Sequence, residues 1–148
     1  MRIATILCSF LLVTVAAGCT NKPTTAAHPA AQSAVEATAK MHPDVVRLTV
    51  HMVPPAGGAS TAIASTAAEK VGKASDAEDL QAMATGQPVL KDEKDALDVT
   101  VPAMQKDGKW TAAIGVTLKA AAGADKEALK KKATEIATSV EKAIAGHK

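Results

Sequence analysis

Two alternating apolar segments joined by a tight turn constrain the fold of this chain more than any other feature. Apolar side chains occupy every second position of both segments: Leu97, Val99 and Val101, then Trp110, Ala112, Ile114, Val116 and Leu118. The connection contains Asp107-Gly108, a pair that supplies the positive φ angles of a two-residue hairpin turn. The period of two indicates β-strands, and the short connection requires them to pair antiparallel.

Three further strands are expected upstream of this hairpin. Residues 45–53 form the first, and 54–58, rich in Pro and Gly, form a loop after it. Along the first strand, one face is expected to carry Val46, Leu48, Val50 and Met52, and the other Arg47, Thr49 and His51. Residues 61–65 are predicted to form the second strand and 88–90 to start the third, with the charged run 91–95 as a solvated turn.

Apolar positions at helical spacing predict three helices. The first covers 31–41 and ends at His42-Pro43, because proline disfavours helix in the residue before it. The second opens at a capping box, Ser75–Glu78, and ends at Gly86 as a left-handed cap. The third covers 125–145, with Asp125 as its cap. The side chains expected on the buried faces are Ala34, Val35, Thr38 and Met41, then Leu80 and Met83, then Leu129, Ala133, Ile136, Val140 and Ile144.

The order of these elements predicts a single α+β domain over residues 31–148. We expect a five-stranded, mainly antiparallel sheet, with helices at its N- and C-terminal ends and a short helix inserted after the second strand. Residues 19–30 are rich in Pro, Thr and Ala without apolar periodicity, which is typical of a tether.

Residues 1–18 have the layout of a secretion signal. Arg2 is followed by an apolar run too short to span a bilayer, since a spanning helix needs roughly 20 apolar residues. Val15–Cys19 resembles the lipobox of bacterial lipoproteins, which implies cleavage before Cys19 and lipid, palmitate included, on that residue. Thr20, where inner-membrane retention in that family uses Asp, implies an outer-membrane anchor facing the periplasm. The alternative is a plain secretion signal or membrane anchor with Cys19 unmodified.

Composition excludes several classes of function. Loss of the signal lowers the formal net charge from +2 to +1, because Arg2 is its only charged residue, and this near neutrality does not indicate a nucleic-acid partner. Cys8 and Phe10 are lost with the signal, which leaves Cys19 as the one cysteine and Trp110 as the one aromatic residue. We therefore expect no disulfide, no aromatic stacking platform, and a core of Val, Ile, Leu, Met and Ala.

Two stretches resemble the PAS-like single Cache (PDC) domains, and the resemblance in topology covers residues 45–145. One runs from Lys70 to Leu80 and on through Thr85–Val89. The other is Leu97–Leu118, in which the matching motifs are Val101-Pro102, the Asp107-Gly108-Lys109 turn and Ile114-Gly115-Val116. The resemblance implies recognition of a small molecule, often a carboxylate or amine, outside the cytoplasm and between the sheet and its covering loops.

The polar face of the sheet carries the candidate binding residues. Its members are Arg47, Thr49, His51, Asp98, Thr100, Thr111 and Thr117. If the first, fourth and fifth strands are neighbours, Arg47 and Asp98 converge with hydroxyls between them, an arrangement suited to a small zwitterion. With the single aromatic residue added, we predict a ligand site of Arg47, His51, Asp98 and Trp110. The alternative is a solvent-facing sheet in which threonine is present as a good strand former.

No residue pattern indicates catalysis, a cofactor or a metal. The four histidines, His28, His42, His51 and His147, lack zinc-ligand spacing. Gly57–Ser60 lacks the Gly-x-Ser-x-Gly pattern of a nucleophile elbow. Lys130–Lys132 is expected to belong to a solvated helix face. We therefore predict that the protein is not an enzyme.

Two functions remain open at this level. The first is a membrane-anchored small-molecule-binding module of the sensor type, acting without an attached output module. The second is a structural or protein-interaction lipoprotein of the cell envelope, which binds a partner protein and no small ligand.

Overall fold

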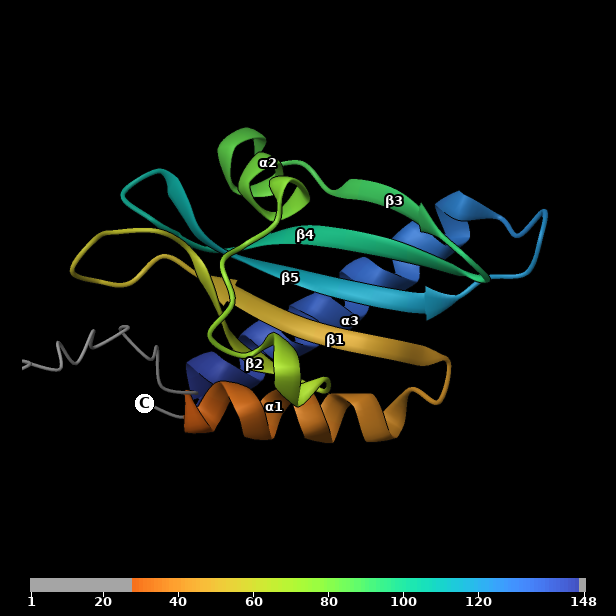
Figure 1. Cartoon of the computed structure of the whole chain (residues 1–148), viewed down its shortest axis with the longest axis horizontal. Helices are drawn as coiled ribbons and strands as arrows, with labels where there is room; N and C mark the ends of the chain where they lie inside the picture. The colour runs from red at the N-terminus through yellow and green to blue at the C-terminus, as the bar shows by residue number, and fades with distance from the viewer. Residues whose placement is uncertain (1–27, 147–148) are drawn as a thin grey trace, which may run out of the picture.

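The computed structural model describes residues 28–146 of the chain as one sheet covered by helices on both faces (Figure 1). The strands lie in the order β2-β1-β5-β4-β3, and all neighbours are antiparallel. The elements are α1 (Pro29–Met41), β1 (Val45–Met52), β2 (Thr61–Ser65), η1 (Ala68–Lys70), α2 (Ala77–Thr85), β3 (Val89–Glu93), β4 (Ala96–Lys106), β5 (Lys109–Lys119) and α3 (Lys126–Gly146). The predicted α+β class and element order are confirmed. Within this range no helix is long and apolar enough to cross a bilayer.

The β4–β5 hairpin has the predicted turn. Asp107 and Gly108 both have positive φ, 50° and 74°, and Lys106 faces Lys109 across the two-residue connection. Positive φ at both central residues matches the turn to the right-handed twist of the strands. β5 then pairs with β1 on its other side, so the hairpin provides the centre of the sheet.

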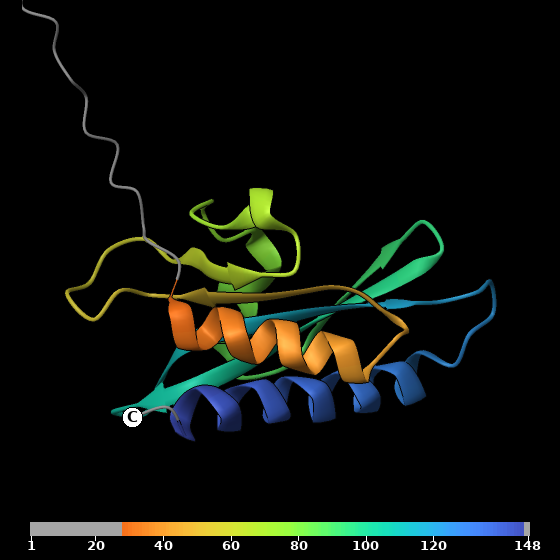
Figure 2. The ribbon, with the colours of Figure 1, turned by 90° about the horizontal axis from the view of Figure 1, so that it is seen from below.

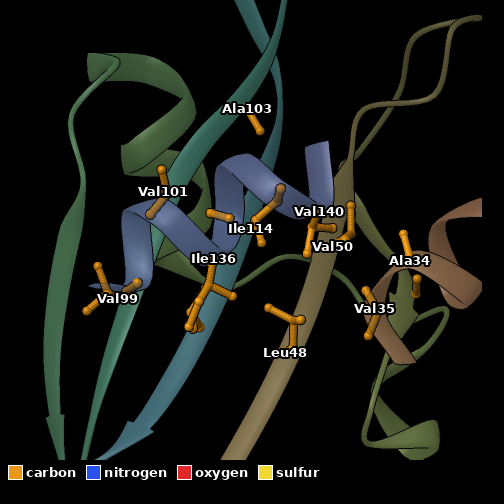
Figure 3. Close-up of a cluster of buried hydrophobic side chains, with 14 of the residues drawn as sticks. Ala34, Val35, Leu48, Val50, Val99, Val101, Ala103, Ile114, Ile136 and Val140 are labelled. Atoms are coloured by element: carbon orange, nitrogen blue, oxygen red, sulfur yellow. The ribbon is translucent and has the colours of Figure 1, made fainter. Parts of the chain in front are cut away.

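The hydrophobic core lies between one face of the sheet and the helices α1 and α3, which run side by side beneath it (Figures 2 and 3). Its largest fully buried apolar side chains are Leu48, Leu97, Ile114, Leu118, Ile136, Val35, Val50, Val99, Val116 and Val140. The buried members of this cluster are all Ala, Val, Ile or Leu. The core composition expected from the sequence is therefore confirmed on this face of the sheet.

The helix ends are set by side-chain caps. His28 precedes α1 and its Nδ1 accepts the backbone N–H of Ala31, so the helix begins at Pro29, two residues earlier than predicted. Asp125 accepts the N–H groups of residues 127 and 128 at the start of α3, as expected. The predicted signal, Cys19 and residues 19–27 of the predicted tether lie outside the described residues. The tether prediction is wrong for residues 29–30, which belong to α1.

Three predictions along β1, β3 and α1 are wrong. The β1–β5 register shifts between Val45 and Arg47, and this bulge leaves Val46 52% exposed instead of buried. Met41 is 67% exposed because α1 ends there, beyond its last contact with the core. The charged run is not all turn: residues 91–93 continue β3, and only 94–95 form the turn.

The inserted helix is capped one residue later than predicted. Asp76, not Ser75, is the N-cap of α2, and the backbone N–H of Asp76 donates to the Asp79 carboxylate at 2.8 Å. Asp79 is buried at 4% exposure and Leu80 is 50% exposed, although the sequence pattern placed Leu80 on the buried face. Gly86 ends the helix in the left-handed conformation, as predicted.

Candidate functional site

A pocket of about 130 Å³ lies between the polar face of the sheet and the segment that contains η1 and α2. Both elements cover the face opposite α1 and α3 (Figure 1). The pocket is lined by Arg47, Thr49, His51, Lys70, Asp76, Glu78, Asp79, Lys91, Glu93, Asp98, Thr100 and Gly115. These residues come from the sheet and from the η1–α2 segment, so the pocket is formed by parts of the chain that lie far apart in the sequence.

Strand alternation and register position the floor of the pocket. Thr49 on β1 faces Gly115 on β5, and Thr117 on β5 faces Asp98 on β4. A side-chain carbon added at Gly115 would meet no atom within 4 Å, so the missing side chain keeps this part of the pocket open. The floor hydroxyls are nevertheless buried: Thr49, Thr100 and Thr117 are each at most 5% exposed. The alternative of a solvent-facing sheet is therefore wrong for its central strands.

One side of the pocket is an ion-pair cluster around Arg47. The guanidinium Nη2 lies 3.0 Å from Glu93 Oε1 and 3.9 Å from Asp98 Oδ1. Thr117 donates its hydroxyl to Asp98 Oδ1 at 2.6 Å, which fixes that carboxylate against the sheet. Arg47 and Asp98 thus converge across β5 with a hydroxyl between them, in the arrangement expected from their strands.

The other side of the pocket contains a buried pair, His51 and Asp79. His51 Nδ1 lies 3.3 Å from Asp79 Oδ2 and 3.0 Å from Ser75 Oγ. Ser75 donates its single hydroxyl proton to Ser60 Oγ at 2.7 Å, so it accepts from His51. The neutral imidazole therefore carries its proton on Nδ1, and Nε2 has a free lone pair.

Burial shifts both members of this pair toward their neutral forms. It lowers the pKa of His51 to about 4; the Asp76 carboxylate opposes this shift and Lys70 adds to it. Burial also raises the pKa of Asp79 to about 6. The Asp76 backbone N–H opposes that shift, whereas the charges of Asp76, Asp98 and Glu78 add to it. Near pH 7 the pair is consequently a neutral imidazole beside a carboxylate.

The pocket has an excess of negative charge at neutral pH. Its acidic residues are Asp76, Glu78, Asp79, Glu93 and Asp98, and its cationic residues are Arg47, Lys70 and Lys91. Two of the cations are engaged, Arg47 with Glu93 and Lys91 with Glu78 at 2.6 Å. Its formal charge is therefore −2 with His51 neutral. A ligand with a positive group is favoured by this balance.

The arrangement differs from a catalytic triad. In a Ser-His-Asp relay the serine and the carboxylate contact opposite ring nitrogens, whereas Ser75 and Asp79 both approach Nδ1 of His51. Among residues 28–146, no cluster of three or more His, Cys, Asp or Glu side chains is placed to hold a metal ion. The geometry is suited to binding a small polar group.

Trp110 lies away from the other three predicted ligand residues. Trp110 lies against Gly86 at the end of α2. On the neighbouring strand β4, Met104 has a φ of +55° and packs toward the helix-covered core. The indole lines a separate open groove with Val53 and Leu80, and it is not part of the pocket. The structure therefore brings together Arg47, His51 and Asp98, but not Trp110. Thr111, predicted on the same polar face, instead donates its hydroxyl to Met104 O.

Sequence reasoning missed the pocket residues that the η1–α2 segment and β3 contribute. The capping pattern Ser75–Glu78 predicts a cap for Ser75 and gives no role to Asp79, the next residue along the chain. Lys91 and Glu93 were assigned to a turn. The alternation of these two residues with Leu90 and Asp92 was the available signal that they share one strand face.

The fold is similar to those of solved GAF domains. The GAF domain of a phosphoenolpyruvate-protein phosphotransferase from Acinetobacter superposes with a TM-score of 0.51 at 17% identity, over 76% of this chain and 78% of that one. The fold is PAS-like. A type II free methionine-R-sulfoxide reductase from Thermoplasma acidophilum gives a TM-score of 0.49 at 15% identity, over 75% and 89% of the two chains. No protein-family model and no curated protein matches the chain.

Proposed function

We propose that the protein is a lipid-anchored binding module that holds a small zwitterion or amine outside the cytoplasm, in the pocket beneath α2. The observation that supports this function most directly is the polar pocket, in which Arg47 and the carboxylates of Asp79 and Asp98 approach from different elements. The predicted assignment to single Cache domains agrees with this position of the pocket and forms part of the proposal.

The charges of the pocket suggest how such a ligand is oriented. Asp79 and Asp98 repel each other and lack a full complement of cations, so an ammonium group placed between them relieves the repulsion. Arg47 uses one nitrogen for Glu93 and has further N–H donors for a ligand carboxylate. A volume of about 130 Å³ limits the ligand to the size of a small amino acid or diamine.

A thermal-shift screen of amino acids, diamines and carboxylates, followed by calorimetry, tests the ligand-binding proposal. A ligand at 100 times its dissociation constant raises the free energy of unfolding by about 2.7 kcal/mol. We expect a shift from zwitterions or amines and none from simple carboxylates. No shift from any of the three classes contradicts the proposal.

Two variants make the screen specific to the pocket. Gly115→Val fills the open space above β5 without the strain of a positive φ, so it removes binding while the fold is kept. Asp98→Asn removes one pocket carboxylate and weakens binding of an ammonium group. Asp92→Asn is the matched control, because this exposed carboxylate pairs with Lys126 outside the pocket. Equal effects of Asp98→Asn and Asp92→Asn would contradict the assignment of the pocket.

The anchor is tested separately. We expect Cys19→Ser to block lipidation and to leave the precursor uncleaved, because the thiol is the acceptor of diacylglycerol in the lipobox that Val15–Cys19 resembles. Fractionation and mass spectrometry of the N-terminus provide the measurement, and we expect the parent in the outer-membrane fraction, facing the periplasm. Normal processing of the serine variant would contradict the anchor.

A further inference from the structure

The end of the domain at which α1 begins also contains the only tryptophan of the sequence. Figures 1 and 2 agree that the start of α1, the β1–β2 loop and the β4–β5 turn lie at one end of the molecule. The α1–β1 connection and the β3–β4 turn lie at the other end. Trp110 follows the β4–β5 turn directly, so it belongs to the first of these ends.

Trp110 forms an open groove with apolar and basic neighbours, which we call the Trp110 surface. The surface comprises Val53, Leu80, Met83 and Trp110, with Lys106 and Lys109 of the hairpin beside it. Leu80 is 50% exposed, and both lysines are exposed. An indole and a leucine beside exposed ammonium groups match the boundary between lipid headgroups and acyl chains, where tryptophan and lysine are favoured.

The indole of the Trp110 surface is held in place by a backbone contact. Gly86 has a φ of +68°, and a Cβ there would lie 2.5 Å from Trp110 Nε1, so the indole packs directly on the backbone at the end of α2. This contact fixes the orientation of the ring without covering the groove. Trp110 is therefore held in place and remains partly exposed.

We propose that the Trp110 surface rests on the membrane to which the protein is anchored, with the indole and Leu80 in the headgroup region and Lys106 and Lys109 on anionic lipid. This inference rests on the proposed lipid anchor at Cys19. Eight residues, 20–27, separate Cys19 from His28, a length that spans at most about 30 Å. The opposite end of the domain is about 20 Å farther along α1. The tether therefore needs the least extension when the end with Trp110 faces the lipid.

Tryptophan fluorescence tests the contact directly, because Trp110 is the only tryptophan. The chain from Cys19 to Lys148 retains every described element and has one thiol, which can be coupled to a maleimide lipid in phosphatidylglycerol-containing vesicles. We expect coupling to move the Trp110 emission to shorter wavelength and brominated lipids to quench it. Because the lipid is attached chemically, the outcome does not depend on natural lipidation of Cys19. The proposal of a lipid anchor and the proposal of a membrane contact can therefore fail independently.

Matched variants separate the membrane from other occupants. Leu80→Ser should lose most of the quenching, whereas Val46→Ser, at a residue of similar exposure (52%) near the other end of β1, should keep it. Lys106→Glu with Lys109→Glu should weaken quenching on phosphatidylglycerol but not on phosphatidylcholine. Three results would overturn the proposal: no quenching in the coupled parent, equal loss in both serine variants, or a blue shift that depends on protein density without quenching. The last of these would assign the surface to a second copy of the chain.

Discussion

The two faces of the sheet are both covered, but they are filled by different chemistry. Against α1 and α3 the strands bury Leu48, Ile114 and other aliphatic side chains in a continuous cluster. Beneath α2 the same strands bury hydroxyls and an imidazole, next to the buried Asp79 carboxylate of α2. Adjacent residues of one strand therefore serve opposite environments: Leu48 and Val50 face the core, whereas Thr49 and His51 face the pocket.

This difference indicates that the two faces of each strand have separate roles, one in stability and one in forming the polar site. Burial of apolar area stabilises the fold roughly in proportion to the area removed from water. Burial of charged groups costs free energy unless partners compensate it, and the pocket leaves an excess of carboxylates. We infer that the helix-covered face provides stability and that the face beneath α2 gives up some stability in order to keep a polar site.

The largest effect is expected on the helix-covered face. Leu48→Ala removes a fully buried side chain and should lower the free energy of unfolding by about 2–5 kcal/mol. Val46→Ala on the same strand, at a half-exposed position, should change it by less than about 0.5 kcal/mol. Urea unfolding of both variants measures the difference. Equal losses of unfolding free energy in the two variants would contradict the burial of Leu48 and the exposure of Val46 on β1.

A second prediction concerns the packing of α2 over the polar face. Gly86→Ala introduces a side chain at positive φ and against Trp110 Nε1, with an expected cost of about 2–3 kcal/mol. Gly123→Ala is the control, because Gly123 also has positive φ (+81°) but its Cβ would meet nothing within 4 Å. Its cost should be about 1 kcal/mol, from the backbone alone. Similar unfolding midpoints in the two variants would exclude tight packing of Trp110 on α2.

The buried pair predicts two opposite dependences on pH. The pKa of His51 is about 4 in the fold and about 6.5 when unfolded, so only the unfolded chain gains this proton between those values and stability falls as pH is lowered. The pKa of Asp79 is about 6 in the fold and lower when unfolded, so the folded chain gains that proton first and stability rises as pH is lowered. In the parent these two slopes largely cancel.

Removing one partner should reveal the slope of the other. Asp79→Asn should lose about 1–2 kcal/mol relative to the parent between pH 6.5 and pH 4.5, and His51→Gln should gain stability relative to the parent over the same range. Both amides retain hydrogen-bonding groups, which limits the structural disturbance. Unfolding midpoints at four pH values provide the measurement. Parallel profiles for parent and variants would mean that the pair does not titrate as its burial requires.

The sequence predicted the helix-covered face better than the pocket, for a physical reason. Apolar periodicity is a property of single elements, so the core residues of β4, β5 and α3 were identified from local spacing. Arg47 and Asp98 were placed on one face by the same argument. Asp79, in contrast, joins His51 only through the crossing of α2 over the sheet, a contact between distant elements that local spacing does not contain.

The position of Trp110 also could not be predicted from local spacing. Its spacing from Ala112 placed it on the alternating pattern of β5, but Met104 has a positive φ of 55° and packs against the core, while Trp110 lies against Gly86. A backbone conformation of this kind, at a non-glycine residue with positive φ, leaves no trace in hydrophobic periodicity. The position of the one aromatic side chain among residues 28–146 therefore depended on a feature that single-sequence patterns do not contain.

The smallest effect on stability sharpens the comparison of the two faces. Arg47→Gln breaks a partly exposed ion pair with Glu93, and Lys126→Gln breaks an exposed pair with Asp92; each should change the free energy of unfolding by less than about 1 kcal/mol. The two variants are thus matched in stability, but only Arg47 lines the pocket. Calorimetric titration with the ligand found in the screen should show weakened binding for Arg47→Gln and none of this loss for Lys126→Gln. If both variants bind as the parent does, Arg47 is a surface charge, and the ligand contacts only the carboxylates on the other side of the pocket.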